Sequence, residues 1–168
     1  QTCALPIFLE AMPLLPQDVR LWVASEGPET AELKARFGDD ERIEWLGRIS
    51  DEEKVRRLKT ARAFCAPSLR GESFGIVLVE AMAASTPVVA SRIDGYTNVA
   101  THDVDALLVE PQDHRALADA LARVMVDPPC RRVSQQPDAR GRVSTQWTCS
   151  PTVTSTSTTA CSFSRRPT

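Results

Sequence analysis

The sequence contains little that could hold a metal or build a disulfide framework. Its 168 residues include five cysteines and two histidines, and no two cysteines form a C-x-x-C pair. Cys65 lies in an apolar run, which is typical of a small buried residue, and the other cysteines lie in the end segments. His102 and His114 have no ligand-like spacing to any cysteine. We therefore expect neither a metal site nor a fold that depends on disulfides.

Long apolar runs and an excess of basic residues are also missing. No run approaches the ~18 apolar residues of a membrane-spanning helix. The opening Gln1–Phe8 lacks the basic start, apolar run and small-residue cleavage site of a signal peptide. With 20 basic and 22 acidic residues the net charge is −2, so there is no basic stripe for a nucleic acid. The sequence favours a cytoplasmic protein without a nucleic-acid partner.

The middle of the chain alternates short apolar runs with helical patterns, which is typical of a parallel sheet wound with helices. The predicted strands are Val19–Ala24, Ile43–Leu46, Ala63–Ala66, Pro87–Ala90 and Ala106–Val109. The predicted helices are Glu29–Phe37, one from Ser50 to about Thr60, Gly75–Ala84, and one that begins after Asp113. This order predicts one Rossmann-like α/β domain over residues 15–127, with helices flanking the sheet.

Several helices carry start signals or an apolar face. Ser50 and Glu53 form a capping box in which Glu53 reaches back to the helix start, and Val55 and Leu58 are expected to be buried. The Gly75–Ala84 helix is expected to bury an apolar face made of Ile76, Val77, Val79, Ala81 and Met82. The last helix, capped by Asp113, has an apolar face made of Leu117, Leu121, Val124 and Met125.

The two ends of the sequence differ from the middle. Residues 1–14 are expected to be an extraneous or partial segment. Periodicity disappears after Pro128-Pro129, and more than half of residues 144–168 are Ser or Thr. Such a segment has too little apolar surface to offset the entropy lost on ordering, so residues 128–168 are expected to be a disordered tail. The composition is typical of a mucin-like stalk, and a shifted reading frame after about Asp127 explains it equally well.

The most informative stretch is Gly71–Ala84, which reads GESFGIVLVEAMAA. It places Glu72 just before a tight turn at Phe74-Gly75 and Glu80 on the helix that follows. With a rise of 1.5 Å per residue, Glu80 lies roughly 8 Å along the axis from the helix start. A helix N-terminus attracts anions through its free N–H groups and its dipole. Glu72, the helix start and Glu80 could therefore hold sugar, phosphate and ribose in that order.

This stretch resembles the E-x7-E region of retaining GT-B glycosyltransferases. Similar segments are Leu46–Lys54, Ala63–Ser68 and Thr86–Ser91, and the resemblance runs from about Leu15 to Asp127. Within the family it most resembles the family-4 branch that contains the phosphatidylinositol mannosyltransferases. The resemblance implies that the chain is the C-terminal, donor-binding half of a GT-B fold.

The resemblance also implies roles for individual residues. Glu80 would accept hydrogen bonds from both ribose hydroxyls, since each carboxylate oxygen can take one O–H. Glu72 would hold hydroxyls of the transferred hexose near the reacting carbon, which makes it the candidate catalytic residue. Backbone contacts to the donor are implied at Ser73, Phe74, Gly75, Ile76 and Val77. Glycine suits the turn because a ligand can approach a backbone that lacks Cβ.

Contacts to the base are implied for Ile49, Asp51 and Lys54, which match positions that lie against guanine in the mannosyltransferase branch. Open α/β sheets bind ligands at the carboxyl ends of their strands, which supports this placement independently. The alternative is a capped helix start with ordinary surface charges. The implied donor is GDP-mannose, bound as a substrate, with no tightly bound cofactor.

The implied reaction is retaining transfer of a hexose to an acceptor hydroxyl, with phosphatidylinositol at the inner face of the plasma membrane as the acceptor. In these enzymes an Arg and Lys pair stabilises the leaving group. That pair lies upstream of the matched region, and Arg20, Arg48 and Arg70 are not in matching positions. Because the N-terminal GT-B domain is also missing, this chain alone is expected to be inactive.

The sequence departs from the family pattern at two positions, and two alternative functions are to be weighed against the family resemblance. Ser25 and Ser85 stand where glycine is usual, and a left-handed helix end at Ser85 would cost about 1 kcal/mol. The chain could instead be a non-catalytic module that binds nucleotide sugars with the same fold. An unrelated flavodoxin-like or response-regulator-like domain would need an acidic cluster or phosphate loop after its first strand, which Ser25–Pro28 does not supply.

Overall fold

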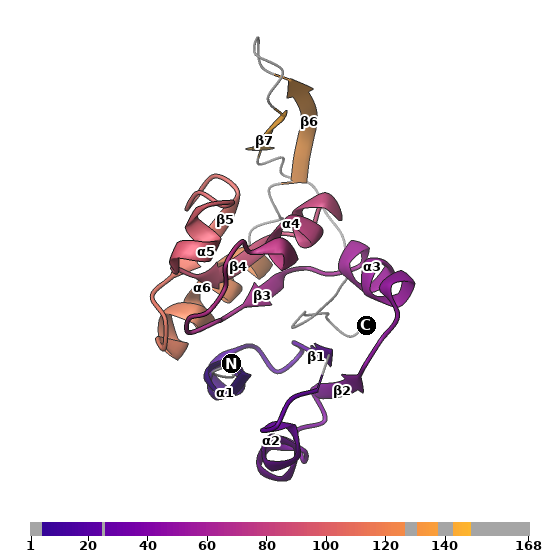
Figure 1. Cartoon of the computed structure of the whole chain (residues 1–168). Helices are drawn as coiled ribbons and strands as arrows, with labels where there is room; N and C mark the ends of the chain where they lie inside the picture. The colour runs from indigo at the N-terminus through magenta and orange to yellow at the C-terminus, as the bar shows by residue number, and fades with distance from the viewer. Residues whose placement is uncertain (1–4, 25, 127–130, 138–142, 149–168) are drawn as a thin grey trace.

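The strands of the central domain are all parallel, as the sequence predicts. The computed structural model describes residues 5–24, 26–126, 131–137 and 143–148, and the side chains of residues 5–24 and 26–125 (Figure 1). The parallel strands are β1 (Leu21–Ala24), β2 (Ile43–Gly47), β3 (Phe64–Ala66), β4 (Val88–Ser91) and β5 (Ala106–Val109). They form a two-stranded sheet, β1-β2, and a three-stranded sheet, β3-β4-β5, rather than one continuous sheet.

Each connection inside a sheet passes through a helix, which is what parallel pairing requires. The helices are α2 (Thr30–Phe37), α3 (Asp51–Lys59), α4 (Ile76–Ala83), α5 (Asp94–Thr97) and α6 (His114–Val126). Helix α5 is not among the helices predicted from the sequence. Asp113 caps α6, since its Oδ1 accepts a hydrogen bond from the Ala116 N–H at 2.8 Å. The predicted α/β class, with helices flanking parallel strands, is therefore confirmed.

One apolar cluster joins the two sheets. Leu21 of β1, Cys65 of β3 and Val89 of β4 belong to the same cluster as Leu117 and Leu121 of α6. These side chains are at most 2% exposed. The two parallel sheets therefore share one core although no strand hydrogen bonds connect them.

The first described helix, α1 (Leu5–Ala11), lies inside this core, whereas the sequence placed the start of the domain at residue 15. Phe8 and Leu9 are fully buried, and Met12 in the 3-10 turn η1 (Met12–Leu14) is 1% exposed. Helix α1 packs against α6. A seven-residue helix has fewer than two turns, so its apolar periodicity is too short to be recognised in the sequence.

Helices α3 and α4 bury only part of the apolar faces expected of them: Leu58, Ala81 and Met82 are buried as predicted. Val55 of α3 is 43% exposed, and Ile76 and Val79 of α4 are 63% and 41% exposed, so the prediction that they are buried is wrong. The buried residues of these helices are Leu58, Leu78, Ala81 and Met82. Nearly every residue of α4 is apolar, so the sequence does not show which side faces the strands.

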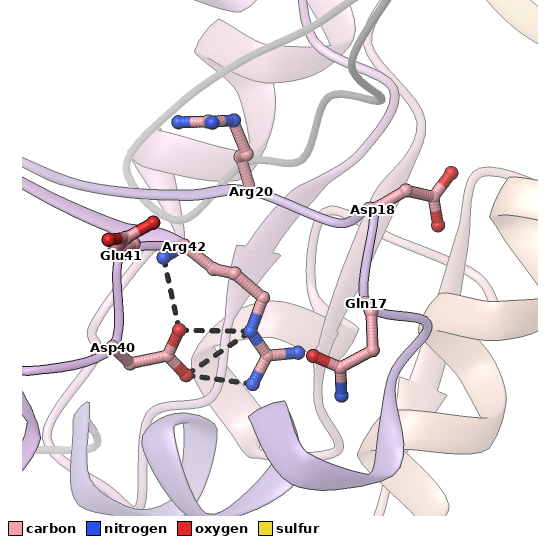
Figure 2. Close-up of a pocket in the computed structure, with 6 residues that line it drawn as sticks. All are labelled: Gln17, Asp18, Arg20, Asp40, Glu41 and Arg42. Atoms are coloured by element: carbon pink, nitrogen blue, oxygen red, sulfur yellow. Dashed lines mark hydrogen bonds and ion pairs between the residues drawn. The ribbon is translucent and has the colours of Figure 1, made fainter.

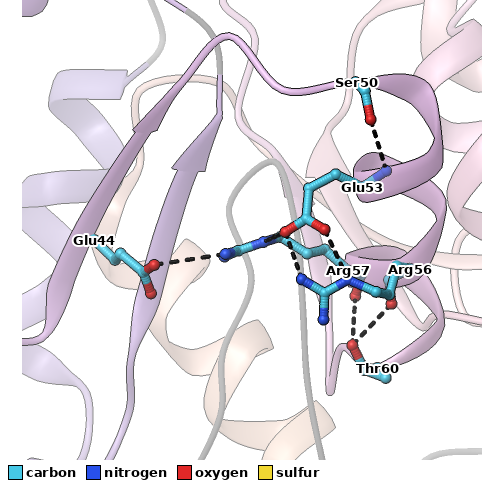
Figure 3. A network of polar contacts seen from close by, with 6 residues as sticks. All are labelled: Glu44, Ser50, Glu53, Arg56, Arg57 and Thr60. Carbon is cyan, nitrogen blue, oxygen red and sulfur yellow. Dashed lines mark hydrogen bonds and ion pairs between the residues drawn. The ribbon is translucent and has the colours of Figure 1, made fainter.

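Arg57 fastens α3 to the β1-β2 sheet (Figure 3). Its guanidinium lies 4.2 Å from the centroid of the Trp22 ring, its Nε lies 2.5 Å from Glu53 Oε1, and an Nη atom lies 3.5 Å from Glu44. Ser50 caps α3 as predicted, by accepting a hydrogen bond from the Glu53 N–H at 3.2 Å. The Glu53 carboxylate accepts hydrogen bonds from Arg57 and Arg56 instead of reaching back to the helix start. These hydrogen bonds, first that of Arg57, hold the pKa of Glu53 below its usual value.

The end of α4 and the C-terminal part of the chain can each be compared with a prediction. Ser85 has a φ of 62°, so the left-handed helix end expected at this position is present. Ser25 and residues 127–130, 138–142 and 149–168 lie outside the described residues. Within the tail, β6 (Arg131–Pro137) pairs antiparallel with β7 (Val143–Thr148), which differs from the expected absence of structure. Across the described ranges, no helix has the length and apolarity to cross a membrane.

Candidate functional site

Three helices of the domain follow the carboxyl ends of parallel strands. Helix α3 follows β2, α4 follows β3, and α5 follows β4. Because the strands of each sheet are parallel, these helices begin at the carboxyl ends of the strands. This edge is where open α/β folds bind ligands. The site residues predicted from the sequence lie at the starts of α3 and α4 or on the segments that lead into them, except Glu80, which lies in the second half of α4.

An ion-pair cluster joins α3 to α4. Lys54 Nζ lies 2.9 Å from Glu80 Oε1 and 3.1 Å from Asp51 Oδ1. Lys54 and Glu80 are half-buried, whereas Asp51 is 93% exposed. Hydrogen bonds to Glu80 and then to Asp51 raise the pKa of Lys54, so it stays protonated at any working pH. The structure therefore brings together residues that the sequence assigned separately to the base and to the ribose.

The turn before α4 depends on Gly75 for packing as well as for backbone conformation. Gly75 is the N-cap of α4, with a φ of 68°. A Cβ at this position would lie 2.9 Å from Tyr96 Cδ1 and 3.0 Å from the carbonyl oxygen of Gly95. The sequence explained this glycine by the approach of a ligand, but its contacts with α5 are sufficient to explain it. The N–H groups of Ile76 and Val77 begin the helix, where they have no intrahelical partner.

Helix α5 supports the segment that carries Glu72, a role that the sequence did not reveal. Gly95 packs so closely on the Glu72 backbone that an added Cβ would lie 2.6 Å from the Glu72 carbonyl carbon. Tyr96 is 1% exposed, and its hydroxyl lies 2.8 Å from Ser68 Oγ. Burial, aided by the negative charge of Glu72, raises the pKa of Tyr96 to about 12 despite the Ser68 hydrogen bond. The sequence feature that could have pointed to this support is Asp94-Gly95-Tyr96, which follows β4 closely.

The remaining predicted residues are not part of the ion-pair cluster. Glu72, Ser73 and Phe74 are exposed, the phenyl group to 62%, and Ile49 is half-buried. Among the described residues, no hydrogen bond or ion pair links Glu72 to Lys54 or Glu80. The part of the chain that the structure describes also has no group of three or more His, Cys, Asp or Glu side chains that could hold a metal.

Comparison with known proteins identifies the family of this domain. The family model described as glycosyl transferases group 1 matches residues 2–127. The chain belongs to this family. The match includes α1, so the helix that the sequence left outside the domain lies within the matched region.

Relatives of this glycosyltransferase domain are known by sequence and by structure. It is 41% identical over 122 residues to a phosphatidyl-myo-inositol mannosyltransferase of Mycobacterium leprae, which covers 71% of this chain and 33% of the relative. It is 38% identical over 107 residues to a D-inositol 3-phosphate glycosyltransferase of Kribbella flavida, which covers 63% of this chain and 25% of that relative. The chain thus spans about a third or less of the length of these curated relatives.

Solved structures show the same architecture. Anabaena HepE, solved in complex with UDP-glucose, matches with a TM-score of 0.63 and 25% identity over 73% of this chain and 35% of its own. Sucrose-phosphate synthase of Thermosynechococcus elongatus matches with a TM-score of 0.65 and 29% identity over 74% of this chain and 33% of its own. These neighbours are GT-B glycosyltransferases, which confirms the predicted resemblance.

A pocket of about 490 Å³ lies at the opposite ends of β1 and β2 (Figure 2). Its lining residues, which precede the two strands, are Gln17, Asp18, Arg20, Asp40, Glu41 and Arg42. Asp40 and Arg42 pair with each other at 2.7 Å, and Arg42 also donates to the Met12 carbonyl oxygen at 3.1 Å. Acidic and basic side chains both line the pocket, and two of them, Asp40 and Arg42, already pair with each other. None of the site residues predicted from the sequence lines this pocket.

The Asp40–Arg42 pair should make stability depend on pH. The hydrogen bond from Arg42 lowers the pKa of Asp40 below 3.8, so its stabilisation is present above that value and is lost as the pH falls through the lower, folded-state pKa. Asp40→Asn should lower the melting temperature by about 3 °C at pH 7, since such a pair contributes about 1 kcal/mol or less. The difference from wild type should shrink as the pH falls below about 4, as thermal unfolding followed by circular dichroism would show.

Asp39 provides the matched control for this measurement. It is exposed, and none of the described hydrogen bonds or ion pairs involves it. The Asp39→Asn variant should therefore have the melting temperature of the wild type at every pH. An Asp40→Asn deficit that is as large at pH 3 as at pH 7 would show that the pair is not the cause.

Proposed function

We propose that this chain is the donor-binding domain of a retaining glycosyltransferase whose donor is GDP-mannose. The observation that carries the proposal is the cluster of Asp51, Lys54 and Glu80 at the carboxyl ends of the strands. The family resemblance assigns the first two residues to the base and Glu80 to the ribose. Base and ribose are adjacent parts of one nucleoside, and the residues assigned to them are in contact here.

The start of α4 would receive the diphosphate. The N–H groups of Ile76 and Val77 and the positive end of the helix dipole stabilise negative charge. In the proposed reaction the bond between C1 of the hexose and the diphosphate oxygen breaks, and the acceptor oxygen bonds to C1 on the same face. The acceptor hydroxyl gives its proton to an oxygen of the departing diphosphate, which leaves as the nucleoside diphosphate. Glu72 would hold hexose hydroxyls during this exchange.

The proposed function also requires an acceptor and a second domain. The Mycobacterium leprae relative is named for phosphatidyl-myo-inositol, so we take this lipid, at the inner face of the plasma membrane, as the acceptor. A second GT-B domain would supply the acceptor site and the basic pair for the leaving group. The exposed side chains of Phe74 and Ile76, 62% and 63% exposed, fit a surface that such a domain covers.

Calorimetric titration of GDP into the full chain, with UDP and ADP in parallel, tests the proposed function. We expect saturable binding that prefers GDP. Glu80→Gln should weaken GDP binding about 30-fold or more, because hydrogen bonds to a charged acceptor are lost. Glu72→Gln should leave GDP affinity unchanged and should reduce the additional affinity that GDP-mannose has over GDP.

Glu32→Gln, on the exposed first turn of α2, is the control and should bind as wild type does. Equal losses of GDP affinity in the Glu72 and Glu80 variants would contradict the assigned roles. A preference for UDP would overturn the choice of donor, and no binding of any of the three nucleotides would overturn donor binding by this chain.

A further inference from the structure

Lys54, which the resemblance assigns to the base, also contacts the carboxylate assigned to the ribose. It begins the second turn of α3, and its ammonium reaches across to α4, where it lies 2.9 Å from Glu80 Oε1. The two residues are 26 positions apart in the sequence. The contact therefore depends on how the helices pack, and it fixes a carboxylate on one helix from the other.

Only one oxygen of the Glu80 carboxylate is used in this contact. Oε1 accepts from Lys54, and none of the described hydrogen bonds reaches Oε2. A glutamate side chain has several rotatable bonds, so an unrestrained carboxylate would lose that freedom when it binds a ligand. The ion pair removes much of this freedom before any ligand arrives and leaves Oε2 available to a hydroxyl donor.

Asp51 restricts the positions that the Lys54 ammonium can take. Its Oδ1 lies 3.1 Å from the same ammonium, so Lys54 is held between carboxylates on two helices. Lys54 is 34% exposed and Glu80 is 39% exposed, so the contact is only partly screened by solvent. The geometry gives Lys54 a fixed position from which it orients Glu80.

We propose that Lys54 is a positioning residue, which holds the Glu80 carboxylate so that it accepts hydroxyls of the ribose in a nucleoside diphosphate. The inference rests on the proposed function and adds the origin of sugar selectivity. Orientation of the carboxylate matters when both vicinal hydroxyls are present and loses importance when one is missing. Lys54 should therefore control discrimination between ribonucleotides and 2′-deoxyribonucleotides, whereas a merely structural ion pair would not.

The experiment measures the affinities of GDP and 2′-deoxy-GDP for the full chain by calorimetry. Wild type should prefer GDP by about 10-fold, as expected for one hydrogen bond to a charged acceptor. Lys54→Met should reduce this preference to less than about 3-fold by weakening GDP more than 2′-deoxy-GDP. Lys59→Met is the matched control, because Lys59 is exposed at the end of the same helix, and it should keep the wild-type preference.

Each other result has a distinct meaning. Equal weakening of both nucleotides by Lys54→Met would identify a direct contact and overturn the positioning role. Tighter GDP binding in that variant would show that Lys54 competes for Glu80, which also overturns it. A wild type that binds both nucleotides equally would remove Glu80 from the ribose and the inference with it. A wild type that binds neither nucleotide would refute the proposed donor binding itself.

Discussion

Replacing Gly95 with alanine is expected to lower the free energy of unfolding by about 3 kcal/mol, because the new Cβ has no space. It would overlap the carbonyl oxygen of Glu72 and lie 2.6 Å from the carbonyl carbon. These are backbone atoms, so they cannot rotate away as a flexible side chain could. To accept the methyl group, α5 must separate from the segment that carries Glu72. Urea unfolding followed by circular dichroism measures the loss.

Gly27→Ala is the matched control for this substitution. No heavy atom lies within 4 Å of a Cβ built at Gly27, so the change should be neutral or stabilise by up to about 1 kcal/mol. If Gly95→Ala and Gly27→Ala unfold at the same urea concentration, α5 does not pack on the motif as described.

Phe8→Ala should be at least as damaging, with an expected loss of about 3–5 kcal/mol in the free energy of unfolding. The side chain is fully buried in the cluster that joins the two sheets, and the substitution leaves a cavity between α1 and α6. Chemical denaturation at constant protein concentration measures the effect. The slope with denaturant should stay unchanged if the variant still unfolds in one step.

Leu14→Ala is the control for Phe8→Ala, since Leu14 is apolar, close in sequence and 54% exposed. A change of less than about 1 kcal/mol is expected at such a position. A Phe8→Ala protein as stable as the Leu14→Ala protein would mean that α1 is dispensable, and that the domain does begin near residue 15.

The part of the fold that could be predicted is the part with local signals. The strand at Ala106–Val109 has the predicted bounds, and the cap at Asp113 is confirmed. Helix α1 was missed because seven residues carry too little periodicity, and α5 was missed because its four residues resemble a turn. The exposure of Val55 depends on which way α3 faces, and Arg57 decides that through contacts with β1 and β2.

The candidate site shows the same division. The residue types and spacing of the motif predicted Glu72 and Glu80, and the family resemblance added Lys54. Their arrangement could not be predicted, because the Lys54–Glu80 contact joins residues that are far apart in sequence and depends on the packing of α3 beside α4. Gly75 is a clear example: the sequence predicted a special glycine, but only the structure shows that Tyr96 crowds it.

The stacking of Arg57 on Trp22 makes the molecule suited to an optical measurement. The Trp22 indole lies beneath a guanidinium that belongs to α3, the helix that carries Lys54. The emission of an indole depends on the charges and solvent around its ring, so its fluorescence should change whenever α3 lifts from the sheet. In a variant in which Trp45 and Trp147 are replaced by phenylalanine, Trp22 would report, without any added label, whether the helix that orients Glu80 is in place.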